Sequence, residues 1–288
     1  MQVNLSELSE VKGVGKKTIQ RIREYKLSNE GYISEYDDSL HLDRNSVNQG
    51  DCLELMNGIP DKSVDMILAD LPYGTTSCSW DSIIPLDKLW LQYERIIKDN
   101  GAIVLTASQP FTTKLINSNI NLYRHEWVWN KKIAGNGILA KIQPLKIHEN
   151  IVVFGKNKVK YKPIKTKSKM YYHKGGNGLP KHLGANVKVN EYKSDERYPT
   201  TIQEFKKPAH IGSNAERAKN CVHPTQKPVK LFEYLIKTYT DEGDLVLDNV
   251  AGSGTTGVAC QNTNRDYILI EKEEKYIGII RDRLAGRI

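Results

Sequence analysis

The chain has 288 residues, of which 39% are hydrophobic and 26% charged, ordinary values for a soluble globular protein with ample length for a buried core. This composition excludes wholesale disorder and collagen-like structure. No stretch approaches the roughly 20 apolar residues of a membrane span, and the first residues, MQVNLSELSEVKG, lack the apolar core of a signal peptide. We therefore expect a cytoplasmic protein with no membrane partner.

The four cysteines show neither C-x-x-C spacing nor a companion pair of histidines. This pattern argues against a zinc site and against a disulfide framework. We expect reduced thiols, and no bound metal, at Cys52, Cys78, Cys221 and Cys260.

The formal net charge of +8 is unevenly distributed. Residues 156–221 contain 16 Lys and Arg against 5 Asp and Glu, a net charge of +11, so the remainder carries −3. Lysines recur from Lys156 to Lys169, and tyrosines lie among and after them. This pattern suits a surface that meets a polyanion through lysine–phosphate contacts and tyrosine stacking. A solvated lysine-rich loop is the alternative.

Two short apolar-patterned segments joined by a glycine turn occupy residues 8–22 and predict a helical hairpin. This segment resembles the helix-hairpin-helix motif. The resemblance implies contacts to DNA phosphates from the turn and its flanking lysines, here Lys12, Gly13, Gly15, Lys16 and Lys17. A plain hairpin packed on its neighbour is the alternative, and we favour DNA contact because two glycines and three lysines coincide.

Residues 27–45 are polar without a strong period and predict a linker, whereas the chain from Val47 onward alternates between strand and helix patterns. The basic segment 156–221 interrupts this rhythm without a sustained period of its own. The predicted strands are 63–70, 101–107, 123–129, 149–154, 244–248 and 266–270, and the predicted helices are 86–98, 111–117, 228–239, 255–261 and 273–284.

Residues 245–259, LVLDNVAGSGTTGVA, predict a strand, a glycine turn and the start of a helix. Exposed N–H groups at such a turn hold polar or anionic ligands. The turn fits G-x-G-x-x-G, and the next strand ends in Glu271, which would also suit a nicotinamide oxidoreductase. Only a helix, a strand and a last helix follow, however. The remaining strands must therefore come from earlier in the chain, in one sheet of permuted order.

A second motif, Asp70-Leu71-Pro72-Tyr73, begins at the last residue of the apolar run SVDMILAD. Together with Asp248-x-x-Ala251-Gly252-x-Gly254-Thr255-Thr256, it resembles the paired motifs of S-adenosylmethionine-dependent DNA amino-methyltransferases. The tetrapeptide comes first, then the basic segment, then HPTQKP at 223–228 and the glycine loop, which is similar to the β class of that family. The resemblance runs from about residue 45 to the C-terminus.

The resemblance implies an α/β fold: a Rossmann-like, mostly parallel methyltransferase sheet with permuted motif order, flanked by helices. A basic target-recognition insert and an N-terminal helical hairpin would be added to it. The predicted divisions are a DNA-contacting segment with its linker at 1–45, a catalytic half at 46–155, the insert at 156–221 and a cofactor-binding half at 222–288. The implied cofactor is S-adenosylmethionine, and the implied partner is double-stranded DNA.

The tetrapeptide suits methyl transfer to an exocyclic amine, whose lone pair is delocalised into the base. The Asp70 carboxylate and a main-chain carbonyl at Leu71-Pro72 can each accept an N–H bond, which favours the pyramidal nitrogen of the transition state. Pro72 stiffens the turn, and Tyr73 offers a stacking plane for an extruded base. The family usually has proline where this chain has Leu71, a change that a main-chain acceptor tolerates.

The resemblance also implies which residues contact the cofactor. Glu271 takes the ribose hydroxyls, while Thr225 and Lys227 meet the cofactor carboxylate. Asp51 matches the acidic position near the cofactor adenine, with a helix N-cap as the alternative. The methionine part borders the strand end and glycine loop, at Asp248, Ala251, Gly252, Gly254, Thr255 and Thr256.

Within the resemblance, aspartate at the first position of the tetrapeptide is usual for adenine enzymes, so Asp70 favours N6 of adenine over N4 of cytosine. An NAD-dependent oxidoreductase and a non-catalytic DNA-binding protein are the alternatives from other classes. The sequence leaves open a homodimer and a cognate restriction nuclease as partners.

Overall fold

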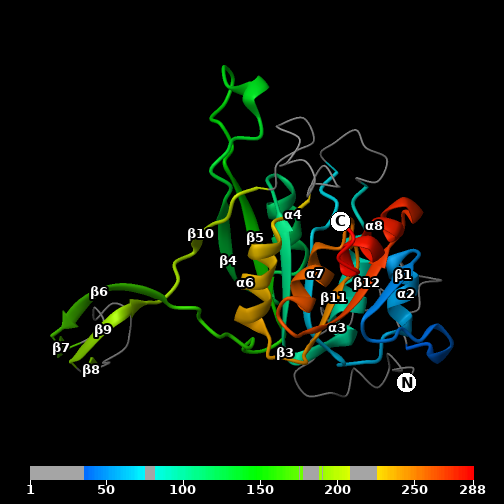
Figure 1. Cartoon of the computed structure of the whole chain (residues 1–288), viewed down its shortest axis with the longest axis horizontal. Helices are drawn as coiled ribbons and strands as arrows, with labels where there is room; N and C mark the ends of the chain where they lie inside the picture. Colours follow the sequence, from blue (N-terminus) through cyan, green and yellow to red (C-terminus); the bar gives the residue numbers. More distant parts are fainter. Residues whose placement is uncertain (1–35, 75–81, 175, 178–187, 190, 208–225) are drawn as a thin grey trace, which may run out of the picture. The chain divides into compact units, whose positions relative to one another are not determined.

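The computed structural model describes residues 36–74, 82–174, 176–177, 188–189, 191–207 and 226–288 (Figure 1). The predicted hairpin at 8–22 lies outside the described residues, and so do its proposed DNA contacts and one predicted cofactor contact. These residues are Lys12, Gly13, Gly15, Lys16, Lys17 and Thr225.

One eight-stranded sheet organises the chain in the order β1-β12-β11-β2-β3-β5-β4-β10. All neighbouring strands are parallel except where β5 pairs with β3 and with β4. The C-terminal strands β11 and β12 lie beside β2, which confirms the mostly parallel sheet with permuted order. The strands are β1 (Ser46–Gln49), β2 (Val64–Ala69), β3 (Ile97–Ala107), β4 (Tyr123–Asn130), β5 (His148–Phe154), β10 (Ile202–Glu204), β11 (Leu245–Asp248) and β12 (Asp266–Glu271).

Strand β2 lies at the centre of the sheet, and all six of its residues are buried. Ile67 and Ala69 pack into the apolar layer on one face, while Met66 and Leu68 pack into the layer on the other. A strand covered on both faces needs no polar alternation, which explains why it reads as a continuous apolar run in the sequence.

Helices cover both faces of the sheet (Figure 1). The apolar side chains of α2, α3 and α4 share one buried layer, and those of α6, α7 and α8 share the other. The helices are α2 (Cys52–Leu55), α3 (Leu86–Ile96), α4 (Phe111–Ser118), α6 (Val229–Tyr239), α7 (Thr255–Gln261) and α8 (Glu274–Leu284), with short 3-10 turns η2 (Asp38–Leu40), η3 (Met56–Gly58) and η4 (Gly137–Leu139).

The position of the site follows from these layers. Strands β2 and β11 are neighbours, yet the helix after β2 packs on one face and the helix after β11 on the other. The two connections diverge, which leaves a crevice at the carboxyl ends of this strand pair.

Most predicted elements agree with the structure to within one or two residues, but some differ. Helix α3 ends at Ile96 rather than at residue 98, because Ile97 already begins β3. Strand β1, SVNQ, was not predicted because it is short and polar. Strand β5 is antiparallel to both neighbours. Residues 36–45, expected to be a linker, include the turn η2.

The basic segment contains more order than its sequence predicts. Strand β10 joins the main sheet beside β4. Two further antiparallel pairs form sheets of their own: β6 (Thr166–His173) with β9 (Tyr192–Arg197), and β7 (Gly176–Asn177) with β8 (Lys188–Val189).

Part of the lysine run lies at the amino edge of the sheet. Lys160 Nζ lies 2.6 Å from Asp244, just before β11, and 2.8 Å from Asp241. Lys162 is also paired with Asp241. The crevice lies at the carboxyl edge of the sheet. These two lysines therefore neutralise acidic side chains at the edge opposite to the crevice.

Among the described residues, no helix has the length and apolarity needed to cross a membrane. The same residues contain no cluster of His, Cys, Asp and Glu arranged to hold a metal ion. Cys52 and Cys260 are buried free thiols.

The glycine loop provides a stability test. Gly254 has φ +78°, and a Cβ there would lie 3.0 Å from Ile280. We expect Gly254→Ala to lower the free energy of unfolding by about 1–2 kcal/mol, the penalty for an L-residue in the left-handed region. Gly278, exposed in α8 with open space around it, is the matched control.

Gly278→Ala should raise the free energy of unfolding by about 1 kcal/mol, because alanine is the better helix former. Urea denaturation of both variants measures the difference. Equal effects of the two substitutions would show that the loop conformation does not require glycine.

Candidate functional site

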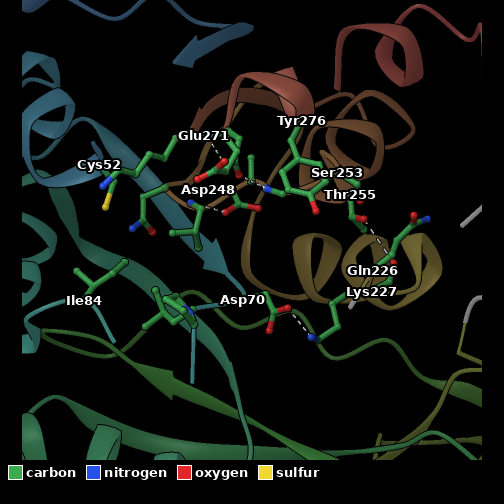
Figure 2. Close-up of a pocket in the computed structure, with 18 of the residues that line it drawn as sticks. Cys52, Asp70, Ile84, Gln226, Lys227, Asp248, Ser253, Thr255, Glu271 and Tyr276 are labelled. Atoms are coloured by element: carbon green, nitrogen blue, oxygen red, sulfur yellow. Dashed lines mark hydrogen bonds and ion pairs between the residues drawn. The ribbon is translucent and has the colours of Figure 1, made fainter. Parts of the chain in front are cut away.

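A cavity of about 400 Å³ opens at the carboxyl ends of β2, β11 and β12 (Figure 2). This volume lies in the range of small-molecule and cofactor sites. The predicted site residues that line it are Asp51, Asp70, Leu71, Pro72, Tyr73, Lys227, Asp248, Ala251, Gly252, Thr255 and Glu271. Two other predicted residues, Gly254 and Thr256, do not line the cavity.

The glycine loop turns tightly between β11 and α7. Gly252 has φ +52°, a conformation that L side chains rarely adopt, and a Cβ there would meet nothing within 4 Å. The Ala251 N–H donates to the Ile270 carbonyl at 2.9 Å, which fixes the loop against β12. The backbone of the loop therefore borders open space in the cavity.

Asp248 ends β11 and is buried beneath the loop. It accepts a hydrogen bond from the Val250 N–H at 3.1 Å and a close one from the Thr256 hydroxyl. Burial raises the pKa of Asp248 to about 7, against the opposing effect of these hydrogen bonds. Asp248 and Thr256 thus tie the loop to the strand before it and the helix after it.

Glu271 and Asp51 supply carboxylates on the β12 side of the cavity. Glu271 accepts from the Gly252 N–H at 2.7 Å and from the Glu273 N–H at 2.9 Å, and burial raises its pKa. Asp51 accepts from the Leu53 N–H at 2.9 Å, which confirms that it is the N-cap of α2. Each carboxylate keeps lone pairs that are available to a ligand.

Asp70 follows β2 and is held from both of its oxygens. Oδ1 accepts the Tyr73 hydroxyl at 2.9 Å and a close contact from the Thr106 hydroxyl. Oδ2 lies 2.5 Å from Lys227 Nζ (Figure 2). Since a carboxylate offers about four lone-pair sites, Oδ2 retains one acceptor position, and Asp70 lines the cavity.

Lys227 belongs to a buried network of alternating charges. Its Nζ also lies 3.5 Å from Glu149 Oε2, and Lys131 Nζ lies 3.1 Å from Glu149 Oε1. Burial alone would lower the pKa of Lys227, but Asp70 and Glu149 outweigh it and raise the pKa. Burial likewise opposes ionisation of Glu149, yet Lys227 and Lys131 lower its pKa overall. Both groups are therefore charged at neutral pH.

Glu149 is the main site residue that the sequence did not predict. It lines the cavity because β5 is antiparallel to its neighbours, which brings the start of that strand to the carboxyl edge of the others. In a wholly parallel sheet Glu149 would lie at the opposite edge. The only sequence signal was a carboxylate at the start of an apolar strand, which is common and unspecific.

Two aromatic side chains, Tyr73 and Trp129, line the cavity, and a third ring lies behind Tyr73. The Tyr73 ring stacks on Phe111 with centroids 5.3 Å apart. Burial, followed by the charge of Asp70, raises the pKa of the Tyr73 hydroxyl, so it stays protonated and donates. Trp129 also lines the cavity, and its indole N–H donates to the Phe205 carbonyl at 2.8 Å.

The cavity fits the S-adenosylmethionine that the motifs imply. Carboxylates at Asp51, Asp248 and Glu271 suit vicinal hydroxyls, an ammonium group and a cationic sulfonium. The open space above Gly252 admits a ligand close to the loop backbone. On the opposite side, Asp70 and Tyr73 provide a polar acceptor and a flat apolar surface for a second molecule. The arrangement therefore suits group transfer between two bound molecules.

Residues 64–282 match the N6/N4 DNA methylase family. Among curated relatives, the type II methyltransferase M.HpaI of Haemophilus parainfluenzae is 26% identical over 246 residues, covering 81% of this chain and 71% of the relative. The DNA adenine methyltransferase YhdJ of Escherichia coli is 27% identical, covering 82% of this chain and 81% of the relative. The type II methyltransferase M2.DpnII of Streptococcus pneumoniae is 48% identical over 64 residues, 22% of this chain and 24% of the relative.

Solved structures show the same fold. The complex of M1.HpyAVI with S-adenosylmethionine aligns with a TM-score of 0.56 and 22% identity, covering 83% of this chain and 99% of that one. The cytosine-N4-specific PvuII DNA methyltransferase aligns with a TM-score of 0.57 and 17% identity, covering 84% and 87%. The family match decides against the nicotinamide oxidoreductase alternative. The chain belongs to the N6/N4 family of S-adenosylmethionine-dependent DNA methyltransferases.

Proposed function

We propose that the protein transfers a methyl group to N6 of adenine in double-stranded DNA. The observation that carries this proposal is the Asp70 carboxylate, which lines the cavity with both oxygens fixed and one acceptor position left on Oδ2. Aspartate at this position is the choice that the motif resemblance associates with adenine. The relative YhdJ, named a DNA adenine methyltransferase, also supports adenine, whereas N4 of cytosine is the competing target.

Asp70 acts on the nitrogen of the target amine. An N–H bond from the amine to Oδ2 draws electron density onto the nitrogen and favours the pyramidal geometry of the transition state. The Lys227 ammonium and the Tyr73 hydroxyl hold the carboxylate in place beforehand. Little reorganisation is then needed during the reaction, and preorganised polar groups of this kind supply much of the catalytic effect.

The rest of the tetrapeptide positions the base. The Leu71 carbonyl is proposed to accept the second N–H of the amine, and Pro72 restricts the turn that carries it. The half-buried Tyr73, backed on one face by Phe111, offers a rigid ring on which an extruded base can stack.

The glycine loop and the carboxylates around it are proposed to hold the cofactor. S-adenosylmethionine supplies an electrophilic methyl group when bound. Glu271 would accept the ribose hydroxyls, Asp51 would lie near the adenine, and the loop residues Ala251, Gly252 and Thr255 would border the methionine part.

Lys227 is proposed to act both on Asp70, beside the target base, and on the carboxylate of the cofactor. An ammonium group has three donors; Asp70 accepts one of them, and Glu149 Oε2 lies 3.5 Å from the nitrogen. The third is available to the cofactor carboxylate. Thr225, outside the described residues, is proposed as a second partner for that carboxylate.

DNA contacts are proposed at two further places. One is the predicted hairpin with Lys12, Lys16 and Lys17, and the other is the target-recognition segment 156–221. A homodimer, a cognate restriction nuclease and a cytoplasmic location stay predictions. The names of the type II relatives support the nuclease.

Replacing Asp70 tests the proposal directly. We expect Asp70→Asn to reduce kcat by about 100- to 1000-fold, the scale on which one preorganised hydrogen bond to a transition state acts. Affinities for S-adenosylmethionine and for duplex DNA should stay close to wild type. Incorporation of labelled methyl groups into DNA from a methylation-free host measures the rate, and mass spectrometry of the nucleosides identifies the product.

Asp43→Asn is the matched control, because Asp43 is a highly exposed carboxylate that does not line the cavity. Its rate should equal that of wild type. Full activity of Asp70→Asn would remove the proposed role of that carboxylate. Formation of N4-methylcytosine alone would correct the target base, and no methylated nucleoside from wild type would favour a non-catalytic DNA-binding protein.

The raised pKa of Asp248 predicts a pH effect on stability. Folding raises this pKa from its ordinary value of 3.8 to about 7. Between these values the folded protein holds a proton that the unfolded chain has released, so stability falls as pH rises through this window. Asp248→Asn cannot ionise and escapes that loss. The melting temperature of Asp248→Asn minus that of wild type should therefore rise from pH 5 to pH 8.

The same comparison for Glu242→Gln, an exposed carboxylate with no ion pair among the described residues, serves as the control and should stay flat over the same pH range. A difference for Asp248→Asn that is constant with pH would contradict the raised pKa.

A further inference from the structure

The loop between β4 and β5, residues 131–147 and here called the β4–β5 loop, exposes an unusual number of apolar side chains. Six of the sixteen exposed large apolar side chains in the described part of the chain lie in it. Ile138 is 98% exposed and Ile142 is 80% exposed. The others are Ile133, Leu139, Leu145 and Ile147. A concentration of this kind indicates a surface with a partner.

The loop has a defined structure that presents these side chains outward. Asn136 crosses it with two hydrogen bonds, donating to the Pro144 carbonyl at 3.2 Å and accepting from the Lys146 N–H at 2.7 Å. At the tip, the Ile142 N–H donates to the Leu139 carbonyl at 2.9 Å. Figure 1 shows the loop extending beyond the ends of β4 and β5.

The base of the loop is connected to the catalytic residues. Strand β5 is antiparallel to both β3 and β4, so β4 ends at the same edge of the sheet as β2, which precedes Asp70. Lys131, the first residue of the loop, pairs with Glu149, and Glu149 pairs in turn with Lys227 beside Asp70. The apolar tip is thus carried by a loop anchored to the site where a target base must arrive.

The charge of the loop identifies its partner. It contains four lysines and no Asp or Glu, and two of the lysines, Lys131 and Lys132, pair with Glu149 and Glu204 outside the loop. Lys141, next to Ile142 at the tip, is exposed and has no ion pair among residues that the structure describes. An apolar tip beside the unpaired charge of Lys141 suits a polyanion with an apolar interior, which is a description of stacked bases between phosphate backbones.

We propose that Ile138 and Ile142 insert into the base stack of the DNA when the target base leaves it, an inference that rests on the proposed function. Extrusion of a base opens a gap in the duplex and costs the energy of unstacking. Aliphatic side chains fill such gaps in other DNA-deforming proteins and offset part of that cost. Lys141 at the tip holds an adjacent phosphate, and the anchored base of the loop sets the distance between the two isoleucines and Asp70.

The test compares Ile138→Ser/Ile142→Ser with Ile120→Ser. Ile120 is 57% exposed and lies just before β4, at the opposite edge of the sheet, so it is a matched loss of exposed apolar surface. The DNA probe is a short duplex of the context that wild type methylates, with a fluorescent base analogue at the target position. The second probe is the same context, unlabelled, with an abasic site opposite the target base, which makes extrusion cheap.

We expect the double variant to lose the fluorescence increase on the paired duplex and to methylate it about 10- to 100-fold more slowly, because the unstacking cost is no longer offset. On the abasic duplex its rate should return close to wild type. Ile120→Ser should match wild type on both duplexes. Recovery on the abasic duplex is the result that a merely structural role of the loop would not produce.

Three results would overturn the inference. One is an unchanged fluorescence increase in the double variant. Another is an equal loss of rate on both duplexes, which would assign the loop to general DNA affinity. The third is a dimer in wild type that becomes a monomer in the double variant by sedimentation, which would make the tip a contact between two copies of this chain.

Failure of the proposed function is distinguishable from failure of the insertion. If wild type transfers no methyl group to any DNA, the proposed function fails. Insertion of Ile138 and Ile142 is then decided by affinity for a fully paired duplex and for the same duplex with an abasic site. A loss of affinity by the double variant on the paired duplex alone supports insertion, whereas an equal loss on both duplexes or no loss on either overturns it.

Discussion

Lys227 Nζ and Asp70 Oδ2 lie 2.5 Å apart although 157 residues separate them in the chain. This ion pair joins the tetrapeptide that begins at Asp70, which comes first in the chain, to the segment that precedes the glycine loop, which comes last. The Lys227 side chain is buried, so an unpaired charge there would be costly, and the Asp70 side chain is only 22% exposed. Glu149 and Lys131 extend the pair into a network that also fixes the base of the β4–β5 loop.

The strand order of the sheet brings Asp70 and Lys227 together. Because β11 and β12 insert beside β2, the permuted order in the chain still produces a continuous row of parallel strands whose carboxyl ends share one edge. The connections leave β2 and β11 toward opposite faces, and the crevice between them receives the glycine loop from one side and Asp70 from the other. Two bound molecules can therefore meet there without any element crossing the sheet.

The sequence predicted the parts of the site that follow from local pattern. Asp70 ends a buried run, and Gly252 and Gly254 lie between a strand and a helix, so each could be located without the fold. Glu149 could not, because its position depends on the antiparallel direction of β5. The ion pair of Lys227 with Asp70 also depends on long-range packing. The charge count predicts one basic surface over residues 156–221, whereas Lys160 and Lys162 pair with acids at the opposite edge of the sheet. A charge count alone cannot separate these two lysines from the rest.

A double-mutant cycle on the free energy of unfolding tests most directly whether the Lys227–Asp70 pair couples the two halves of the site. The cycle compares wild type, Asp70→Asn, Lys227→Met and the double variant in urea. Direct contact in a buried network predicts a coupling energy of about 1–3 kcal/mol, with the double variant less destabilised than the sum of the single variants. Additive effects within about 0.5 kcal/mol would contradict this account.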